Sequence, residues 1–382
     1  MLSVLNLVRI AFASSFEAVE SNFLFCLSLI LALLMPPHTT GSVQNGLTGY
    51  VFRFACLDGG LRIFLTDNCT VCSPSRSKIP NEIEGLESLF FLNLFDNKIQ
   101  GSIPFEYLAK TLVNLIMPVN EIQGSIPEEP LKEFSKLRVL WLDFNRISGT
   151  LPTNMAAFLP VLTVASFGNN LLEGPIPQSF FNIEGIETVV LSNNLLTGTI
   201  PDMTLSKINS LDVQGNIMTG TLPQSISSLV DLFLISFLDN QLSGTIPTQI
   251  GALTKLQFIG LSGNEMTGDP TSQDFLWQLT NLNSLFLGNN GFTGSLNDGI
   301  GNLSNLQKFG IQQNEIVGTI PPVIGNLTDL EQLTLSYNQL SGSVPTELAQ
   351  LTRLGTCVFV LVCFSFRLPY LYSVDLSHPD RD

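Results

Sequence analysis

One stretch near the C-terminal end of the chain decides the fold: Leu330-Glu331-Gln332-Leu333-Thr334-Leu335-Ser336-Tyr337-Asn338-Gln339-Leu340-Ser341-Gly342-Ser343-Val344-Pro345. Leucines alternate with polar residues up to an Asn, a Gly follows four residues later, and an apolar residue and a Pro complete the unit. The same order of residues recurs upstream with a period of about 24 residues. A fixed period of this size is typical of a solenoid.

Eleven Asn residues mark the copies of this unit: Asn97, Asn120, Asn145, Asn170, Asn194, Asn216, Asn240, Asn264, Asn290, Asn314 and Asn338. Every copy has a Gly four residues after its Asn, and nine have a Pro at the seventh position. We expect the Asn where each strand leaves its sheet, because its amide can both donate to and accept from backbone groups that the bend leaves unpaired. Gly and Pro suit the turns that follow. We therefore interpret all three as structural residues, not as a catalytic set.

These residues resemble the leucine-rich repeat family, in its plant-specific subclass with the L-x-G-x-I-P element, over roughly residues 79–356. The resemblance implies an α/β fold: a right-handed solenoid with a concave parallel β-sheet, about 11 regular repeats and degenerate ends. Energetics favour the same fold. A unit buries about five aliphatic side chains at roughly 1.5–3 kcal/mol each, against about 1.5 kcal/mol of entropy for each ordered residue. A single repeat is therefore unstable, whereas stacked repeats share their apolar faces.

The 382 residues divide into four predicted segments. Residues 1–41 are expected to be a signal peptide or hydrophobic targeting segment, because the apolar run at 23–35 is too short to span a bilayer but fits a signal-peptide core. An uncleaved anchor and an imperfect gene model are the alternatives. Residues 42–78 are predicted to be a degenerate N-terminal capping region, 79–356 the repeat array, and 357–382 a last degenerate strand and tail. A fragment of a longer receptor also fits this organisation.

Charge, cysteine content and motifs narrow the function. The net charge of −15 argues against nucleic acid or an anionic membrane surface as partner. The two His residues lie outside the array, and we find no nucleophile elbow, P-loop or dinucleotide motif. We therefore expect no enzyme, no cofactor and no metal. The resemblance implies a disulfide-paired cap, Cys56 with Cys69 or Cys72; the Cys69–Cys72 pair alone is a poor zinc site.

Three N-glycosylation sequons begin at Asn68, Asn302 and Asn326. Asn302 and Asn326 are 24 residues apart, so they occupy the same place in consecutive repeats and would carry glycans on one surface. The alternative interpretation is that Gly-Asn-Leu followed by Ser or Thr is ordinary repeat sequence.

A candidate binding face follows from the strand frame. Side chains alternate along a strand, so residues six, four, two and one before each Asn are expected on the concave face. Near the N-terminal end of the array these positions include Phe91, Phe95, Asp96, Trp141, Asp143 and Phe144. Aromatic residues beside acids are typical of an interface hot spot. We predict a protein- or peptide-binding surface centred on Phe91, Trp141 and Phe144; the alternative is that residues 42–78 pack over these aromatics.

Two departures from the repeat have structural consequences. Pro118 lies beside the strand of the second unit and lacks an N–H donor, so we expect a weak ladder there. In the eighth unit Asp269-Pro270-Thr271-Ser272-Gln273 replaces the apolar-Pro pair, and in the ninth Asn297 replaces the Pro. We expect a local bulge on the outer side around residues 269–277.

The interpretation that fits best is a non-enzymatic recognition scaffold, secreted or at the cell surface, similar to the ectodomains of receptor-like proteins. Its ligand would be a protein or peptide, and it would meet a membrane only through a terminal segment. The protein would be cytoplasmic if the N-terminal segment is not a signal. Two alternatives stay open: a secreted inhibitor of a cell-wall glycosidase, similar to polygalacturonase inhibitors, and an ice- or surface-binding solenoid. The latter needs a regular array of Thr or Ser, which the column four residues before each Asn does not supply.

Overall fold

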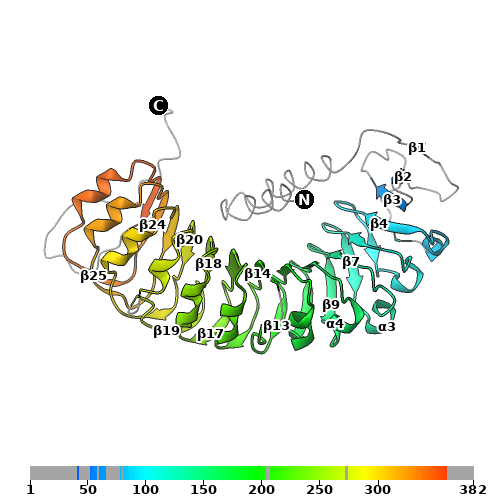
Figure 1. Ribbon diagram of the computed structural model, residues 1–382, viewed down its shortest axis with the longest axis horizontal. Helices are drawn as coiled ribbons and strands as arrows, with labels where there is room; N and C mark the ends of the chain where they lie inside the picture. The colour runs from blue at the N-terminus through cyan, green and yellow to red at the C-terminus, as the bar shows by residue number, and fades with distance from the viewer. Residues whose placement is uncertain are drawn as a thin grey trace.

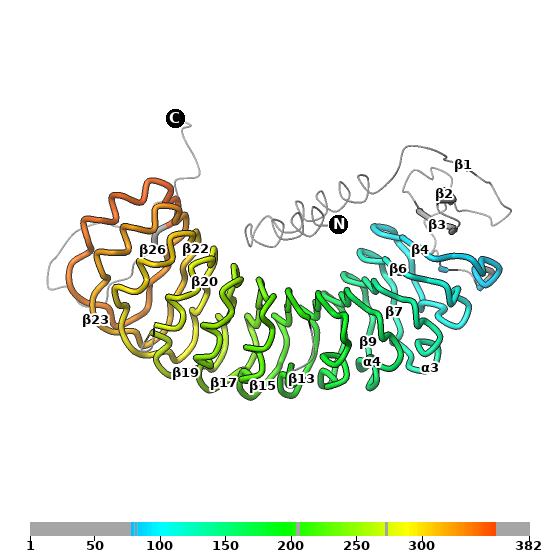
Figure 2. The backbone as a smooth tube through the Cα atoms, in the orientation of Figure 1, coloured from blue at the N-terminus to red at the C-terminus, as the bar shows by residue number. Residues whose placement is uncertain are grey.

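The chain forms a curved solenoid (Figures 1 and 2). The computed structural model describes residues 41–42, 52–57, 60–65, 78–79, 81–203, 207–271 and 274–358, the first three ranges by their backbone alone. In the repeat array the strands of one long sheet line the inner side of the arc, and short second strands lie towards its outer side (Figure 1). Among the described residues, no helix is long and apolar enough to cross a membrane.

The long sheet has 15 strands. The order is β1 (Gly41–Ser42), β2 (Phe52–Leu57), β3 (Gly60–Leu65), β4 (Leu89–Asn93), β6 (Asn114–Ile116), β8 (Val139–Trp141), β10 (Val164–Ser166), β12 (Thr188–Val190), β14 (Ser210–Asp212), β16 (Leu234–Ser236), β18 (Phe258–Gly260), β20 (Ser284–Phe286), β22 (Lys308–Gly310), β24 (Gln332–Thr334) and β26 (Thr356–Val358). From β3 to β26 all neighbours are parallel, whereas β1, β2 and β3 pair antiparallel. The predicted solenoid with a parallel sheet is confirmed.

The short second strands form three further parallel sheets. They are β5 (Gln100–Gly101), β7 (Glu121–Gly124), β9 (Arg146–Thr150), β11 (Leu171–Pro175) and β13 (Leu195–Thr197); β15 (Thr219–Gly220), β17 (Gln241–Gly244), β19 (Glu265–Gly268) and β21 (Gly291–Phe292); and β23 (Val317–Thr319) and β25 (Gln339–Ser341).

Among the described residues the helical segments are single turns, most of them 3-10 helices. They are η1 (Asn81–Gly85), η2 (Phe105–Tyr107), α3 (Glu128–Leu131), α4 (Met155–Phe158), η3 (Gln178–Asn182), η4 (Gln224–Ser228), η5 (Thr248–Ala252), η6 (Leu276–Gln278), η7 (Asp298–Asn302), η8 (Pro322–Asn326) and η9 (Thr346–Gln350). The α component of the predicted α/β class is therefore small. A Pro precedes most of these turns, since its fixed φ suits the residue before a helical turn.

The core lies between the long sheet and the helical turns. Residues five and three before each Asn point into it, as Leu140 and Leu142 do in the third repeat, and both are fully buried. Apolar residues of the helical turns cover them from the other side, among them Phe180 and Phe181 of η3. One continuous cluster of buried side chains runs from Ile79 to Leu351. Every repeat therefore shares its core with its neighbours, as expected for a solenoid.

The repeated Asn residues form a ladder of side-chain hydrogen bonds. The Nδ2 of Asn194 donates to the backbone oxygens of Leu191 in its own repeat (3.1 Å) and Phe167 in the preceding one (3.0 Å). Its Oδ1 accepts from the backbone N–H of Leu172 at 2.9 Å. The pattern recurs from Asn120 to Asn338. Each of these amides thus connects its own bend to the bend of the preceding repeat.

The expectation of a weak ladder at Pro118 is wrong. Strand β6 pairs with both neighbours over its whole length. The ladder continues past it, since Met117 N–H donates to Trp141 O (2.8 Å) and Asp96 N–H donates to Pro118 O (3.0 Å). In other repeats the residue two before the ladder Asn, which corresponds to Pro118, donates its backbone N–H to a side chain. Gly168 donates to Asp143, and Gln214 donates to Asp212. Pro is tolerated because this N–H is not needed by the ladder.

The two irregular units fit one another. In the turn after β19, the N–H and Oγ1 of Thr271 donate to Asp269 Oδ1, at 2.8 and 2.5 Å. Asn297, which stands where Pro is expected, donates to Thr271 O at 3.1 Å and accepts from Gly299 N–H at 2.9 Å. The Asn297 side chain is thus hydrogen-bonded to the irregular turn of the eighth unit, and it also caps the helical turn η7 in the ninth unit.

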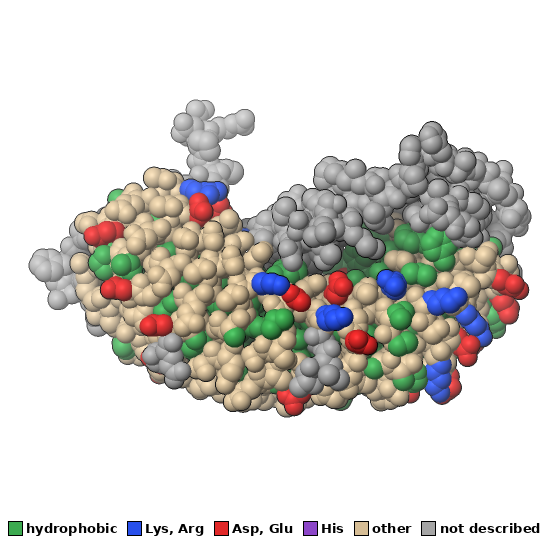
Figure 3. Space-filling view, viewed as in Figure 1, with side chains coloured by type: hydrophobic (Ala, Val, Ile, Leu, Met, Phe, Trp, Pro, Cys, Tyr) green, Lys and Arg blue, Asp and Glu red, His purple; other side chains and the backbone are tan. Residues whose placement is uncertain are grey.

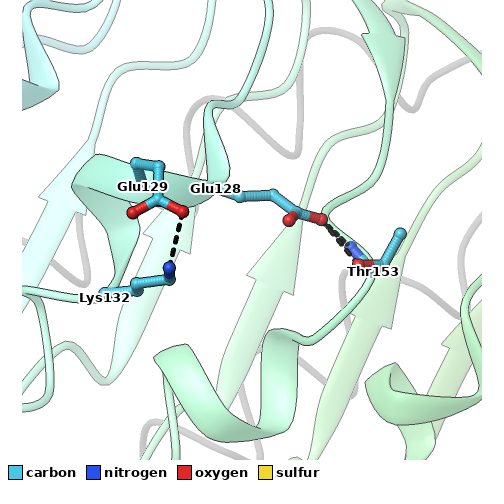
Figure 4. Close-up of polar contacts among 4 residues, drawn as sticks. All are labelled: Glu128, Glu129, Lys132 and Thr153. Carbon is cyan, nitrogen blue, oxygen red and sulfur yellow. Dashed lines mark hydrogen bonds and ion pairs between the residues drawn. The ribbon is translucent and has the colours of Figure 1, made fainter.

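Polar contacts also join repeats on the outer side (Figure 4). Glu128 of α3 accepts from the N–H and Oγ1 of Thr153 in the next repeat, at 2.5 and 2.7 Å, and these hydrogen bonds lower the pKa of its carboxyl. Glu129 pairs with Lys132 at 2.6 Å. We regard the Glu128–Thr153 hydrogen bonds as a support for the register between repeats, whereas the exposed Glu129–Lys132 pair lies within one repeat and contributes little.

Several predictions lie outside the described residues. They concern residues 1–40 with most of the predicted targeting segment, Asn68, Cys69 and Cys72, and the tail from 359 to 382. At the N-terminal end of the array, within the segment predicted to be a cap, β2 and β3 form an antiparallel hairpin. At the C-terminal end, strand β26 pairs with β24.

Candidate ligand-binding face

The strand register places the predicted binding residues on a grid. Phe91 pairs through Asn114 with Val139, and Asn93 pairs through Ile116 with Trp141. Neighbouring strands are about 4.8 Å apart, so the first and third repeats are separated by about 10 Å. Phe91 and Trp141 therefore lie in adjacent columns on diagonal positions, with the second repeat between them.

The six predicted residues differ in exposure. Phe91, Phe95 and Trp141 are half-buried, Asp96 is exposed, and Phe144 is 40% exposed. Asp143 is buried. The structure brings these residues into two groups, on the first and third repeats. The second repeat separates them with Asn114, Ile116, Pro118 and Val119.

Phe144 and Val119 have left-handed backbone conformations. Their φ angles are 52° and 57°, and the residue before the ladder Asn has positive φ in all eleven repeats. A side chain other than Gly, Asn or Asp costs roughly 1–2 kcal/mol there, and a β-branched residue is an outlier. Sequence reasoning missed this conformation, although the column carries its signature: Asp96, Asn169, Asn193, Gly215, Asp239, Gly263 and Asn289.

Asp143 differs from the exposed acid that we expected. Its carboxylate accepts hydrogen bonds from Trp141 Nε1 (2.8 Å to Oδ2), from Ser166 Oγ (2.7 Å to Oδ2) and from the backbone N–H of Gly168 (2.6 Å to Oδ1). Burial raises the pKa of this carboxyl to about 7, although the three hydrogen bonds act to lower it. The Asp143 carboxylate therefore connects Trp141 of the third repeat to Ser166 and Gly168 of the fourth repeat.

The middle of the concave face consists of small and polar residues. Asp212 is buried among Ser192, Ser236 and Gln214, and it accepts from the Gln214 N–H at 3.1 Å. Burial raises the pKa of Asp212 to about 6, against the effect of these hydrogen bonds. The hydroxyl of Ser210, on the same strand, is buried without a hydrogen-bond partner. This section of the face presents little apolar surface.

A second aromatic group lies beyond this polar section. The rings of Phe258 and Phe286 are 5.7 Å apart at an interplanar angle of 56°. Both side chains are half-buried, and Gly260 leaves room for the Phe258 ring, because a Cβ there would come within 2.9 Å of Phe258 Cε1. The face thus has an aromatic group towards each end and a polar middle, which suits an extended ligand with apolar side chains near both ends.

Charged groups on the outer surfaces pair across repeats. Lys110 pairs with Glu133 at 2.9 Å, and Arg353 pairs with Asp329 at 2.7 Å. On the face in Figure 3, Lys and Arg side chains lie among Asp and Glu side chains. Within the part of the chain that the structure describes, no group of three or more His, Cys, Asp or Glu residues could hold a metal ion.

Comparison with known proteins gives partial matches to receptors. The sequence profile of the family described as Leucine Rich Repeat matches residues 136–158 and 329–351. Receptor-like protein 35 of Arabidopsis thaliana is 33% identical over 140 residues, which are 36% of this chain and 14% of that protein. This chain thus spans a small part of the curated relative that it matches.

Two solved plant receptors have a similar fold. The plant peptide hormone receptor RGFR1 in complex with RGF2 is 32% identical with a TM-score of 0.67, covering 74% of this chain and 45% of that one. The Arabidopsis receptor kinase HAESA ectodomain in complex with an extended IDA peptide hormone is 28% identical with a TM-score of 0.66, covering 75% and 52%. This chain therefore spans about half of either receptor ectodomain.

Proposed function

We propose a function from the premise that the chain is a leucine-rich-repeat protein: it is a non-enzymatic recognition scaffold whose concave face binds a peptide or an extended segment of a protein. The primary contact is the aromatic group of Phe91, Trp141 and Phe144, with Phe95 and Asp96 at its edge. Phe258 and Phe286 form a secondary apolar contact further along the face.

One observation carries the proposal: the exposed Phe144, in a left-handed conformation, belongs to the same repeat as the half-buried Trp141. Asn or Gly would relieve the strain at this position, and most repeats have Asn, Asp or Gly there. Strained residues are often found at functional sites, where binding compensates for their cost. Val119 has the same conformation in the adjacent repeat, so two strained apolar residues lie together on this section. The solved receptors with a similar fold are complexes with peptide hormones, which supports a ligand of this class.

Substituting Phe144 tests the proposal. We expect Phe144→Asn to raise the free energy of unfolding by about 1 kcal/mol, because Asn tolerates the left-handed conformation. The same variant, and Trp141→Ala, should weaken binding about tenfold or more, as for hot-spot aromatics. The ligands are peptides selected from a displayed library of short peptides on the full chain, and titration calorimetry measures their affinity.

Tyr337→Asn is the matched control. Tyr337 occupies the same position near the other end of the array, with φ of 56° and 60% exposure. We expect the same gain in stability and unchanged binding. If Phe144→Asn and Trp141→Ala bind the selected peptides as well as the wild-type chain does, the aromatic group is not the site. Loss of stability in Trp141→Ala with unchanged binding would instead favour packing by residues 42–78.

Export of the protein is the second part of the proposal. Asn302 and Asn326 end η7 and η8, and both side chains are exposed. On expression in a eukaryotic secretory host, we expect glycans on both, seen as a mass decrease after enzymatic removal of N-glycans. Ser304→Ala and Thr328→Ala should each abolish one of them. A chain that keeps Met1 and carries no glycan would place the protein in the cytoplasm and contradict export.

An ice- or surface-binding role is a second candidate, supported by one observation. From the fifth to the eleventh repeat, the columns three and five residues after the ladder Asn are rich in exposed or half-buried Thr and Ser: Thr197, Thr199, Thr219, Thr221, Ser243, Thr245, Thr267, Thr293, Ser295, Thr319, Ser341 and Ser343. Asp269 and Val317 interrupt them. These columns lie on or next to the short strands. The column considered in the sequence analysis, four residues before each ladder Asn, lies on the concave face instead. Thermal hysteresis in the purified protein would favour this candidate over peptide binding.

A further inference from the structure

We propose that Asp143 is a positioning residue that holds the Trp141 indole in the binding face, and that uptake of a proton by Asp143 releases the indole and weakens ligand binding. We call Trp141, Asp143, Ser166 and the Gly168 N–H the Asp143 latch. Its effect on a ligand depends on the proposed function, but the latch itself is a property of the free protein and can be tested without a ligand.

The latch uses both oxygens of one carboxylate. Trp141 Nε1 donates to Oδ2 at 2.8 Å, and the Gly168 N–H donates to Oδ1 at 2.6 Å. Ser166 Oγ lies 2.8 Å from Oδ1 and 2.7 Å from Oδ2, so its hydroxyl can donate to either. Hydrogen bonds to an ionised acceptor are roughly twice as strong as neutral ones. The ionised carboxylate therefore fixes both the indole and the next repeat.

A proton on this carboxyl displaces one donor. The ionised group has lone pairs for all three donors, whereas a protonated oxygen becomes a donor and a poor acceptor. Ser166 can rotate its hydroxyl and accept the new O–H. The Gly168 N–H is held by the backbone of the fourth repeat and cannot turn away. The indole of Trp141 is attached through rotatable bonds, so it is the donor that leaves.

The surroundings of Asp143 favour proton uptake near neutral pH. The residues that flank it are uncharged: Pro118 and Val119 in the preceding repeat, and Ser166, Gly168 and Asn169 in the following one. Burial, together with the negative charge of Asp212 on β14, raises the pKa of Asp143 to about 7.

The two Arg residues near Asp143 in the same repeat, Arg138 and Arg146, make no hydrogen bond to its carboxylate in the described part of the chain. Arg146, which follows the ladder Asn, pairs with Glu121 on the short strand of the preceding repeat at 3.5 Å. Arg138, before β8, is exposed. Among the described residues, no Lys or Arg is hydrogen-bonded to the Asp143 carboxylate. The state of the latch therefore changes with pH in the range where Asp143 titrates.

The intrinsic fluorescence of the purified full chain tests the latch directly. We expect the wild-type emission to change with a midpoint near pH 7, because the ionisation of Asp143 changes the surroundings of the Trp141 indole. Asp143→Asn should abolish the transition. Ser166→Ala should move the midpoint to higher pH, because it removes a hydrogen bond that stabilises the ionised form. Asp212→Asn should move it to lower pH, because a negative charge is removed.

The controls separate a latch from general pH effects. Ser284→Ala alters another buried Ser of the concave face, on β20, and should leave the midpoint unchanged. A flat wild-type titration, or the same transition in Asp143→Asn, would overturn the proposal. If Asp143→Asn fails to fold by circular dichroism, the midpoint shift in Ser166→Ala decides; an unchanged midpoint in that variant counts against the latch.

Binding of a selected peptide tests the functional consequence. We expect the affinity to fall about tenfold between pH 8 and pH 6 for the wild type, in line with the hot-spot magnitude assigned to Trp141, and to be independent of pH for Asp143→Asn. A fluorescence transition without peptide binding would contradict the proposed function and leave the latch standing. Peptide binding that does not change with pH would contradict the latch and leave the proposed function standing.

Discussion

Replacing Asn194 by Ala is expected to lower the free energy of unfolding by about 3–5 kcal/mol, the range for the loss of a buried hydrogen-bond network. The substitution leaves the Leu172 N–H without its side-chain partner, and the Phe167 and Leu191 carbonyls each lose one of the two ladder amides from which they accept. Each buried backbone group without a partner costs about 1–3 kcal/mol. Because the bonds cross from one repeat to the preceding one, the loss affects the interface between repeats that stabilises a solenoid.

Urea denaturation followed by circular dichroism measures this change, and Asn182 provides the control. Asn182 is an exposed Asn at the end of η3, and its side chain takes part in one long contact with Gln178, at 3.4 Å. Asn182→Ala should alter stability by less than about 0.5 kcal/mol, as for most surface substitutions. Equal effects of the two substitutions would show that the ladder amides do not hold the repeats together.

The second large effect is a rise in stability as the pH falls from about 8 to about 5. The folded-state pKa values of Asp143 and Asp212, about 7 and about 6, lie above 3.8, the usual pKa of an Asp side chain in an unfolded chain. Between each pair of values the folded chain binds more protons than the unfolded chain, so lowering the pH favours the folded state. The pKa differences correspond to a gain of about 3 kcal/mol from Asp143 and about 1 kcal/mol from Asp212.

Urea denaturation at a series of pH values checks this prediction. We expect Asp143→Asn to remove most of the dependence between pH 8 and pH 5, and Asp212→Asn a smaller part. Ser284→Ala, which alters a buried residue of the concave face that carries no charge, is the control and should leave the slope unchanged. If wild-type stability falls steadily as the solution is acidified from pH 8, these two carboxyls are not held in the buried state described here.

The period of the sequence was sufficient to predict the fold. The Asn, Gly and Pro positions repeat locally, and stacking is the arrangement in which such units bury their apolar faces. The alternation of core and concave residues in β8 follows from strand geometry, so Leu140 and Trp141 could be assigned to opposite faces. We also predicted correctly from the sequence that each ladder Asn donates hydrogen bonds to backbone groups and accepts them, because its amide has both donors and an acceptor.

The properties of the candidate site depended on contacts between repeats. Asp143 was expected to be an exposed acid, but the Ser166 and Gly168 donors of the next repeat enclose it. Pro118 was expected to weaken the sheet, but the register leaves its missing N–H outside the ladder. The sequence pattern within one repeat does not predict which hydrogen-bond donors of the next repeat will lie opposite a given side chain.

The sequence by itself thus determined the solenoid, its ladder of Asn residues and the columns of its concave face, because these follow from local periodicity. Tertiary structure alone decided the burial of Asp143 and its bond to Trp141, and it imposed on Val119 and Phe144 a left-handed conformation that their own side chains disfavour. The physical reason is that strain, desolvation and hydrogen-bond geometry are set by how adjacent repeats pack, and that packing exists only once the chain has folded.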